Sequence, residues 1–165
     1  IDFKIVGEGS QLQSIKLQTY LKKLANVEFI GHQNKEGVKR ILNITDASYV
    51  SFADLPVLAT NSPNKLFDSL ASGKLTIVNT PGWTKDMVEQ YKCGFYADPH
   101  KPKEFVSKLK PCLEERDSLE AAKNNARSLA ESLYSKKLQI DKLVKVLNNE
   151  NQIQANENEV YILTA

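Results

Sequence analysis

Short apolar runs alternate with helix-like segments through the first 110 residues of the chain. In one such segment Leu17, Tyr20, Leu21 and Leu24 recur at i, i+3, i+4 and i+7, which predicts an amphipathic helix. Strands that alternate with helices pair in parallel through right-handed crossovers. The sequence therefore predicts an α/β protein with a doubly wound parallel sheet. The expected strands are Phe3–Val6, Val27–Ile30, Ala47–Phe52, Leu75–Asn79 and Gly94–Ala97.

Capping signals predict where the helices of this region begin. Ser10 follows the turn Gly7–Gly9 and is the expected N-cap of the first helix. A second helix is expected over Glu36–Leu42. Thr84 is the expected N-cap of a later helix that runs to Tyr91.

The pattern becomes purely helical after Pro102. Three amphipathic segments follow, at Lys103–Leu109, Ser118–Leu133 and Lys136–Leu147. We expect residues 1–112 to form the sheet domain and residues 113–147 to pack on it as C-terminal helices. Residues 148–165 are expected to form an Asn-rich tail with a short apolar end, and the sequence leaves the role of this tail open.

The segment from Asn61 to Lys74 predicts a helix with its charges in an unusual order. Ser62 is the expected N-cap, Pro63 suits the first helical position, and Gly73 suits the left-handed end. A lysine in the first turn is alone unfavourable by ~0.3–1 kcal/mol. Free N–H groups, the helix dipole and Lys65 together favour a phosphate or diphosphate site. The alternative is an ordinary surface pair between Lys65 and Asp68 at i, i+3.

Bulk composition excludes several classes of function. A net charge of +2 and the lack of a long basic block argue against nucleic-acid binding. No apolar run reaches about 18 residues, so no membrane span is predicted and only peripheral attachment stays open. Cys93 and Cys112 lack CxxC spacing, which favours reduced thiols in a cytoplasmic protein. His32 and His100 fit no metal-ligand spacing, so no metal site is predicted.

Several catalytic and cofactor-binding motifs are excluded because a residue that the motif requires is absent. Gly7 and Gly9 lie where a dinucleotide loop would be, but the third glycine of that motif would fall at Leu12. The alternative for these glycines is a tight turn between strand and helix. The run Pro63–Asp68 lacks the glycines and the Lys-Ser/Thr pair of a P-loop. No nucleophile elbow or Cys/His pairing indicates covalent catalysis.

Two further residues have a structural and a functional interpretation. His32 follows a strand at the edge where open sheets bind ligands, so it either lines a base or sugar pocket or is an ordinary loop residue. Trp83 either packs against the following helix, which is the default for so large a side chain, or contacts a sugar.

The string from Asn61 to Lys74 resembles the signature helix of family 4 glycosyltransferases, which have the GT-B fold. Other blocks agree with that family in order and spacing, and the resemblance covers residues 3–147. The Asn-Ser-Pro-Asn-Lys and Gly-Trp variants are similar to the branch that builds bacterial surface polysaccharides. The other blocks are Ile5–Gly9, Val27–Gly31, Asp46–Ala47, Gly82–Trp83, Cys93–Phe95, Asn125–Arg127 and Tyr134–Ser135.

The resemblance implies a Rossmann-like C-terminal domain that binds a nucleotide-sugar donor, expected to be UDP-linked, and faces an N-terminal acceptor domain. It implies that Asp68 binds the ribose hydroxyls and that Gly31 and His32 lie near the base. Gly7 and Gly9 would border the cleft. The donor diphosphate would be held by Asn61, Ser62, Pro63, Asn64 and Lys65. No metal and no further cofactor is expected, because positive groups of the protein would stabilise the leaving diphosphate.

The sequence departs from the family pattern at three places. The paired glutamates of the family fall on Thr60 and Asp68, which are the expected catalytic positions, and Thr60 carries no charge. Leu75 replaces a frequent proline, a change that we interpret as structural. The first strand and helix of the family's domain and the whole acceptor domain have no counterpart, so the chain alone is expected to be inactive.

The resemblance as a whole implies a metal-independent glycosyltransferase of the hexosyl or aminosugar type that retains configuration. Its acceptor would be a lipid-linked sugar or a saccharide in envelope polysaccharide synthesis. Its expected location is the cytoplasm, or the inner face of the cytoplasmic membrane as a peripheral protein. Two alternatives stay open, a GT-B UDP-sugar 2-epimerase and a non-catalytic α/β module for protein contacts.

Overall fold

The computed structural model describes residues 1–148, so almost all of the expected tail lies outside the described residues. The chain divides into two compact units, Ile1–Ile44 and Thr45–Ala165. The expected boundary at residue 112 stays a prediction, and helix α5 (Pro102–Glu114) runs through that position. Within the described part, no helix is both long enough and apolar enough to cross a membrane.

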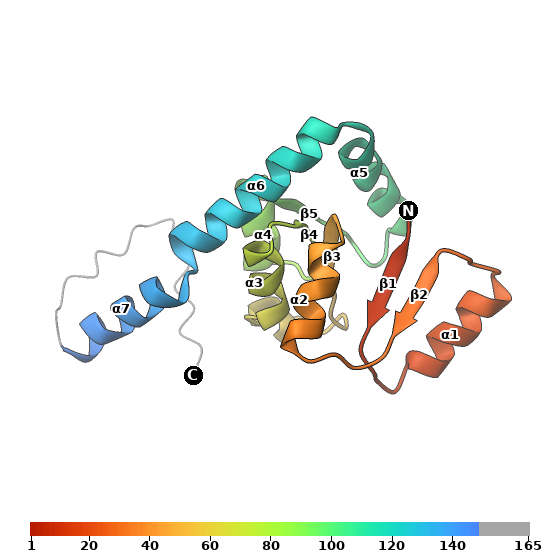
Figure 1. The fold of residues 1–165 in the computed structure, drawn as a ribbon, viewed down its shortest axis with the longest axis horizontal. Helices are drawn as coiled ribbons and strands as arrows, with labels where there is room; N and C mark the ends of the chain where they lie inside the picture. The colour runs from red at the N-terminus through yellow and green to blue at the C-terminus, as the bar shows by residue number, and fades with distance from the viewer. Residues whose placement is uncertain (149–165) are drawn as a thin grey trace. The chain divides into compact units, whose positions relative to one another are not determined.

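The first unit is a β-α-β-α arrangement built around one pair of parallel strands (Figure 1). Phe3 is paired with Val27 and Val6 with Ile30, so the carboxyl ends of both strands lie side by side. The Asn34 side chain caps the second helix by accepting a hydrogen bond from Gly37 N at 2.8 Å. The elements are β1 (Phe3–Val6), α1 (Leu12–Leu21), β2 (Val27–Ile30) and α2 (Lys35–Asn43).

Helix α1 confirms that this segment is helical, but neither the predicted apolar face nor the predicted start agrees with the structure. Ser10 does not cap it, because Leu12 N bonds to Gly9 O and the helix begins two residues after Ser10. Tyr20, which belongs to the predicted apolar face, is 79% exposed. Leu24 lies beyond the end of the helix.

The second unit contains a parallel sheet of three strands in the order β3-β4-β5. The central strand β4 is buried at every position because helices cover both of its faces. The α/β class with parallel strands is therefore confirmed, and the strands form two sheets, β1-β2 and β3-β4-β5. The strands are β3 (Ala47–Val50), β4 (Leu75–Val78) and β5 (Gly94–Tyr96). The helices are η1 (Pro56–Thr60), α3 (Asn64–Ala71), α4 (Trp83–Gln90), α5, α6 (Arg116–Leu133) and α7 (Lys136–Leu147).

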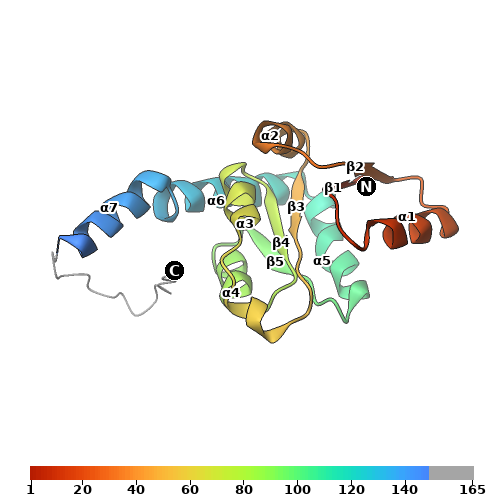
Figure 2. The ribbon, with the colours of Figure 1, turned by 90° about the horizontal axis from the view of Figure 1, so that it is seen from below.

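Helices α3 and α4 lie on one face of this sheet and α5 lies on the other (Figure 2). An apolar cluster lies between the sheet and the helices on each face. On one face Leu66 and Leu70 of α3 pack with α4 and α6, and both leucines are fully buried. On the other face Leu109 of α5 packs with β4 and β5. Helix α6 contributes to both clusters, through Ala126 and Leu119 respectively. This core fixes the start of α3 relative to the carboxyl ends of the strands.

Several predicted boundaries in the second unit were wrong by a few residues. Helix α3 begins at Asn64, with Pro63 rather than Ser62 as its N-cap residue. Thr84 does not cap α4, because it lies inside that helix and its hydroxyl donates to Thr80 O at 3.1 Å. Strand β3 ends at Val50, two residues earlier than expected. The predicted end of α3 is confirmed, since Gly73 has the left-handed φ of +60°.

Candidate functional site

The first turn of α3 has backbone N–H groups that no capping side chain accepts. Pro63 is extended and offers no capping side chain, and only Leu66 N reaches back to Pro63 O, at 3.0 Å. Among the described residues, the N–H groups of Asn64 and Lys65 have no hydrogen-bond partner. Uncapped N–H groups at the positive end of a helix dipole attract anions. The first turn of α3 therefore offers these two backbone N–H groups to the anion that the sequence predicts there.

The Lys65 side chain turns toward the sheet and not along its own helix. Its Nζ lies 3.7 Å from the centroid of the Phe52 ring and donates a hydrogen bond to Ser51 O. Partial burial of the ammonium lowers the pKa of Lys65 below its usual value. The alternative surface pair with Asp68 is therefore wrong, because the lysine tip is occupied elsewhere. The exposed Asp68 carboxylate has no ion pair within the described part of the chain.

Two residues that follow the carboxyl ends of β3 and β4 are joined by a pair of hydrogen bonds. Phe52 N donates to Asn79 Oδ1 at 2.9 Å, and Asn79 Nδ2 donates to Phe52 O at 2.8 Å. Sequence reasoning assigned Phe52 and Asn79 to strands and gave them no further role. The signal that could have identified Asn79 is a polar amide placed directly after the fully apolar end of a buried strand.

Trp83 fixes the segment that leads into α3. Its indole Nε1 donates to Asn61 O at 3.1 Å, and its ring stacks on Phe67 of α3. Trp83 is therefore a packing residue, but the expected partner was wrong: its ring lies on the preceding helix α3, and Trp83 is itself the first residue of the following helix α4. Thr60, at the end of η1, is exposed and its hydroxyl donates to Val57 O at 3.0 Å.

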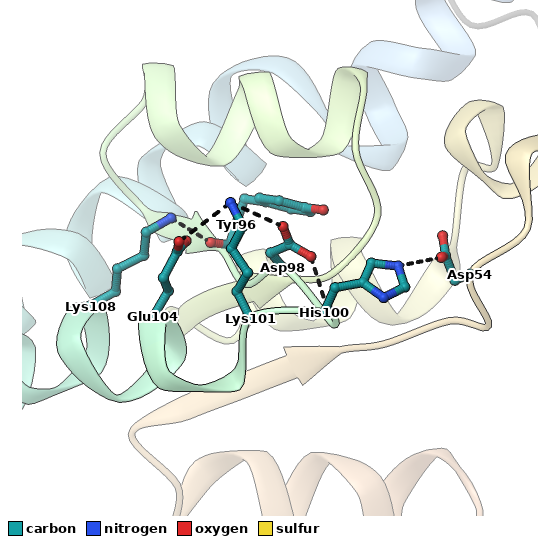
Figure 3. Close-up of polar contacts among 7 residues, drawn as sticks. All are labelled: Asp54, Tyr96, Asp98, His100, Lys101, Glu104 and Lys108. Atoms are coloured by element: carbon teal, nitrogen blue, oxygen red, sulfur yellow. Dashed lines mark hydrogen bonds and ion pairs between the residues drawn. The ribbon is translucent and has the colours of Figure 1, made fainter.

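A polar network borders the same carboxyl edge of the sheet (Figure 3). His100 Nε2 lies 2.7 Å from Asp54 Oδ2, which joins the segment after β5 to the segment after β3. Asp98 Oδ1 accepts a hydrogen bond from His100 N at 2.9 Å, and Lys108 Nζ donates to Tyr96 O at 2.8 Å. Burial, followed by the charges of Asp98 and Asp54, raises the pKa of Tyr96. Sequence reasoning did not anticipate this network.

The remaining predicted site residues lie in the first unit. Gly7 has the left-handed φ of +120° and its N–H donates to Ile30 O at 2.9 Å. A Cβ added at Gly31 would lie 3.7 Å from Glu8 Oε1, so the turn Gly7–Gly9 and Gly31 are neighbours. His32 is exposed. The structure thus brings the glycines together at one edge, and their part in ligand binding stays a prediction.

Comparisons with known proteins agree with this architecture. The family model described as "Glycosyl transferases group 1" matches residues 1–129. HepE of Anabaena in complex with UDP is 16% identical with a TM-score of 0.74, covering 90% of this chain and 41% of HepE. TarM of S. aureus, in a complex that includes UDP, is 18% identical with a TM-score of 0.72, covering 90% of this chain and 29% of TarM.

A third solved structure, the lipopolysaccharide glycosyltransferase WaaG, is 16% identical with a TM-score of 0.66. The match covers 88% of this chain and 37% of WaaG. This chain therefore spans less than half the length of each of these three proteins. No curated protein sequence matches. Because the family model covers most of the chain, the chain belongs to the group 1 glycosyl transferases and has the fold of a GT-B C-terminal domain.

Proposed function

We propose that the chain binds a nucleotide-sugar donor, expected to be UDP-linked, for a retaining glycosyltransferase. The whole enzyme would transfer the sugar to a lipid-linked or saccharide acceptor in envelope polysaccharide synthesis. The chain is similar to WaaG, which is described as involved in lipopolysaccharide biosynthesis, and this similarity supports a role in envelope polysaccharide synthesis. Its location would be the cytoplasm or, by peripheral attachment, the inner face of the cytoplasmic membrane.

The observation that carries the proposal is the uncapped start of α3 with Lys65 beside it. Two free N–H groups, the helix dipole and an ammonium all favour the same ligand, a diphosphate. HepE and TarM were both solved with UDP, which supports a uridine diphosphate in particular. The residues Asn61 to Lys65 would hold the diphosphate in this chain.

The other proposed roles are those that the resemblance to the family implies. Asp68 lies one turn further along α3 with a free carboxylate, which suits the ribose hydroxyls. Thr60 has a hydroxyl for a sugar hydroxyl. Gly31 and His32 would lie near the base, and the turn Gly7–Gly9 would border the cleft. The positive groups at the start of α3 would stabilise the leaving diphosphate without a metal.

A titration of the isotope-labelled chain with UDP, UDP-glucose, UDP-N-acetylglucosamine and GDP-mannose tests the proposal. We expect the amide signals of Asn64 and Lys65 to shift with UDP compounds, and more than with GDP-mannose. A folded chain whose α3 amides do not move with any of these compounds would contradict the donor site. Shifts confined to another surface would favour a protein-interaction module.

A further inference from the structure

The amide of Asn79 connects the end of β4 to the lysine at the start of α3 through one aromatic ring. We propose that Asn79 is a positioning residue that, by clamping the backbone of Phe52, holds the Lys65 ammonium where the donor diphosphate is bound. The role in donor binding rests on the proposed function above. The positioning of Lys65 can be tested without any donor.

The two hydrogen bonds between Asn79 and Phe52 continue the link between the chains of β3 and β4 beyond the last paired residues. The paired residues of β3 and β4 end at Val50 and Val78, and Phe52 lies two residues beyond that end. There the Asn79 side chain supplies both an acceptor, 2.9 Å from Phe52 N, and a donor, 2.8 Å from Phe52 O. A carboxamide can offer a donor and an acceptor at once, from two neighbouring atoms. The backbone orientation of Phe52, and with it the direction of its ring, is thereby set by Asn79.

The Lys65 ammonium lies against the aromatic ring of Phe52. Lys65 Nζ lies 3.7 Å from the ring centroid, within the range of a cation–π interaction, and it also donates to Ser51 O. The backbone of Lys65 is linked to β3 through the Ser69 side chain. Ser69 Oγ donates to Lys65 O at 2.6 Å and lies 2.6 Å from Ser48 Oγ.

The ammonium of Lys65 thus contacts the segment directly after β3, and its backbone is linked to β3 through Ser69. A lysine side chain that is free in solution must be ordered before it can bind an anion, which weakens binding. Here the ammonium is already held in one place, against the Phe52 ring and Ser51 O. An incoming diphosphate would exchange the single carbonyl of Ser51 for charged oxygens, while the Phe52 ring stays beneath the ammonium.

The first experiment follows the Lys65 side chain by NMR in the full chain without donor. The Hε and Hζ protons of Lys65 should show an upfield ring-current shift in the wild-type protein and in the Phe52→Tyr variant. Asn79→Ala and Phe52→Leu should both lose that shift, and in both the pKa of Lys65 should move back toward its ordinary value. Asn125→Ala is the matched control, since Asn125 also donates to a backbone oxygen, that of Lys92 at 3.2 Å.

The second experiment measures the dissociation constant for UDP with the same variants. We expect Asn79→Ala and Phe52→Leu to weaken binding by about three- to tenfold, whereas Phe52→Tyr and Asn125→Ala stay within twofold of the wild type. Should Asn79→Ala fail to fold, Phe52→Leu tests the same link.

The outcomes separate the two proposals. An unchanged Lys65 signal in a folded Asn79→Ala chain would overturn the positioning role, as would unchanged UDP affinity in both Asn79→Ala and Phe52→Leu. If the wild-type chain does not bind UDP while the Lys65 signal responds as expected, the proposed function fails and the placement of Lys65 by Asn79 stands.

Discussion

The indole Nε1 of Trp83 donates a hydrogen bond to the carbonyl oxygen of Asn61, 3.1 Å away and 22 residues earlier in the chain. The same indole stacks on Phe67 with 6.4 Å between ring centroids. The Trp83 side chain thus contacts both the segment that precedes α3 and the first two turns of that helix. Because the free N–H groups of α3 lie between these two contacts, their direction depends on Trp83.

Replacing Trp83 by phenylalanine tests this dependence. Trp83→Phe keeps an aromatic ring against Phe67 but removes the donor to Asn61 O, so we expect the free energy of unfolding to fall by about 1 kcal/mol. Urea denaturation measures this change. The backbone amide signals of Asn61, Ser62, Asn64 and Lys65 should also broaden in the variant. Sharp, unshifted signals there would show that the segment is fixed by other contacts.

Lys65 is expected to supply the largest single side-chain contribution to diphosphate binding. A charge-assisted hydrogen bond contributes about 1.5–3 kcal/mol, so Lys65→Ala should weaken UDP binding by roughly 10- to 150-fold. Isothermal titration calorimetry measures the affinity. Lys110→Ala is the control, since Lys110 is an exposed lysine of α5 whose ion pair with Glu114 lies on the surface. Equal losses in both variants would indicate only a general effect of net charge.

The sequence predicted the order and type of the elements well, for a physical reason. In the run Leu75–Val78 three of the four residues are apolar with no polar alternation, which is typical of a strand covered on both faces. The lysine in the first turn of α3 is also a local signal, and the anion site that it predicts stays a prediction. These signals are local, and local signals can be read from one sequence.

Contacts between distant segments could not be predicted in this way. Asn79 and Phe52 are 27 residues apart, and His100 and Asp54 are 46 apart. Neither pair belongs to a motif with fixed spacing. The capping errors have a different cause. Ser62 and Thr84 are good N-caps by residue type, but the structure has its N-caps one residue later, at Pro63, and two residues earlier, at Gly82.

Gly94 is predicted to be irreplaceable for steric reasons. A Cβ built at this position would lie 1.7 Å from Thr76 O, which is backbone of the neighbouring strand β4 and cannot move aside. Gly94→Ala should therefore lower the free energy of unfolding by about 3 kcal/mol or more. In Gly9→Ala, the matched control, the new Cβ meets nothing within 4 Å. Urea denaturation that showed equal losses for both variants would contradict this account of β4–β5 packing.

Cys93 is expected to be the less reactive of the two free thiols. Burial raises the pKa of Cys93 from 9.0 to about 11, and it also raises the pKa of the partly buried Cys112. Thiol-specific labelling at pH 8 should modify Cys112 before Cys93, because the thiolate is the reacting form and Cys112 is less buried. Labelling in the reverse order would show that Cys93 becomes accessible in the folded chain.

The raised pKa of Cys93 also predicts a dependence of stability on pH. Folding favours the neutral thiol, so this contribution is fully present below pH 9 and is lost as the pH rises through about 11. The free energy of unfolding of the wild-type chain should therefore fall faster over this range than that of Cys93→Ala. Parallel curves for the two proteins would remove Cys93 as the cause.

Asp68 is predicted to recognise the ribose, and a nucleotide lacking one hydroxyl isolates that contact. The Asp68 carboxylate is exposed and free, so it can accept hydrogen bonds from both ribose hydroxyls of UDP. We expect wild-type chain to prefer UDP over 2′-deoxy-UDP by about 10-fold, since a hydrogen bond to a charged group contributes about 1.5–3 kcal/mol. Asp68→Ala should bind both nucleotides equally and weakly. A variant that kept the full preference would place ribose recognition on another residue.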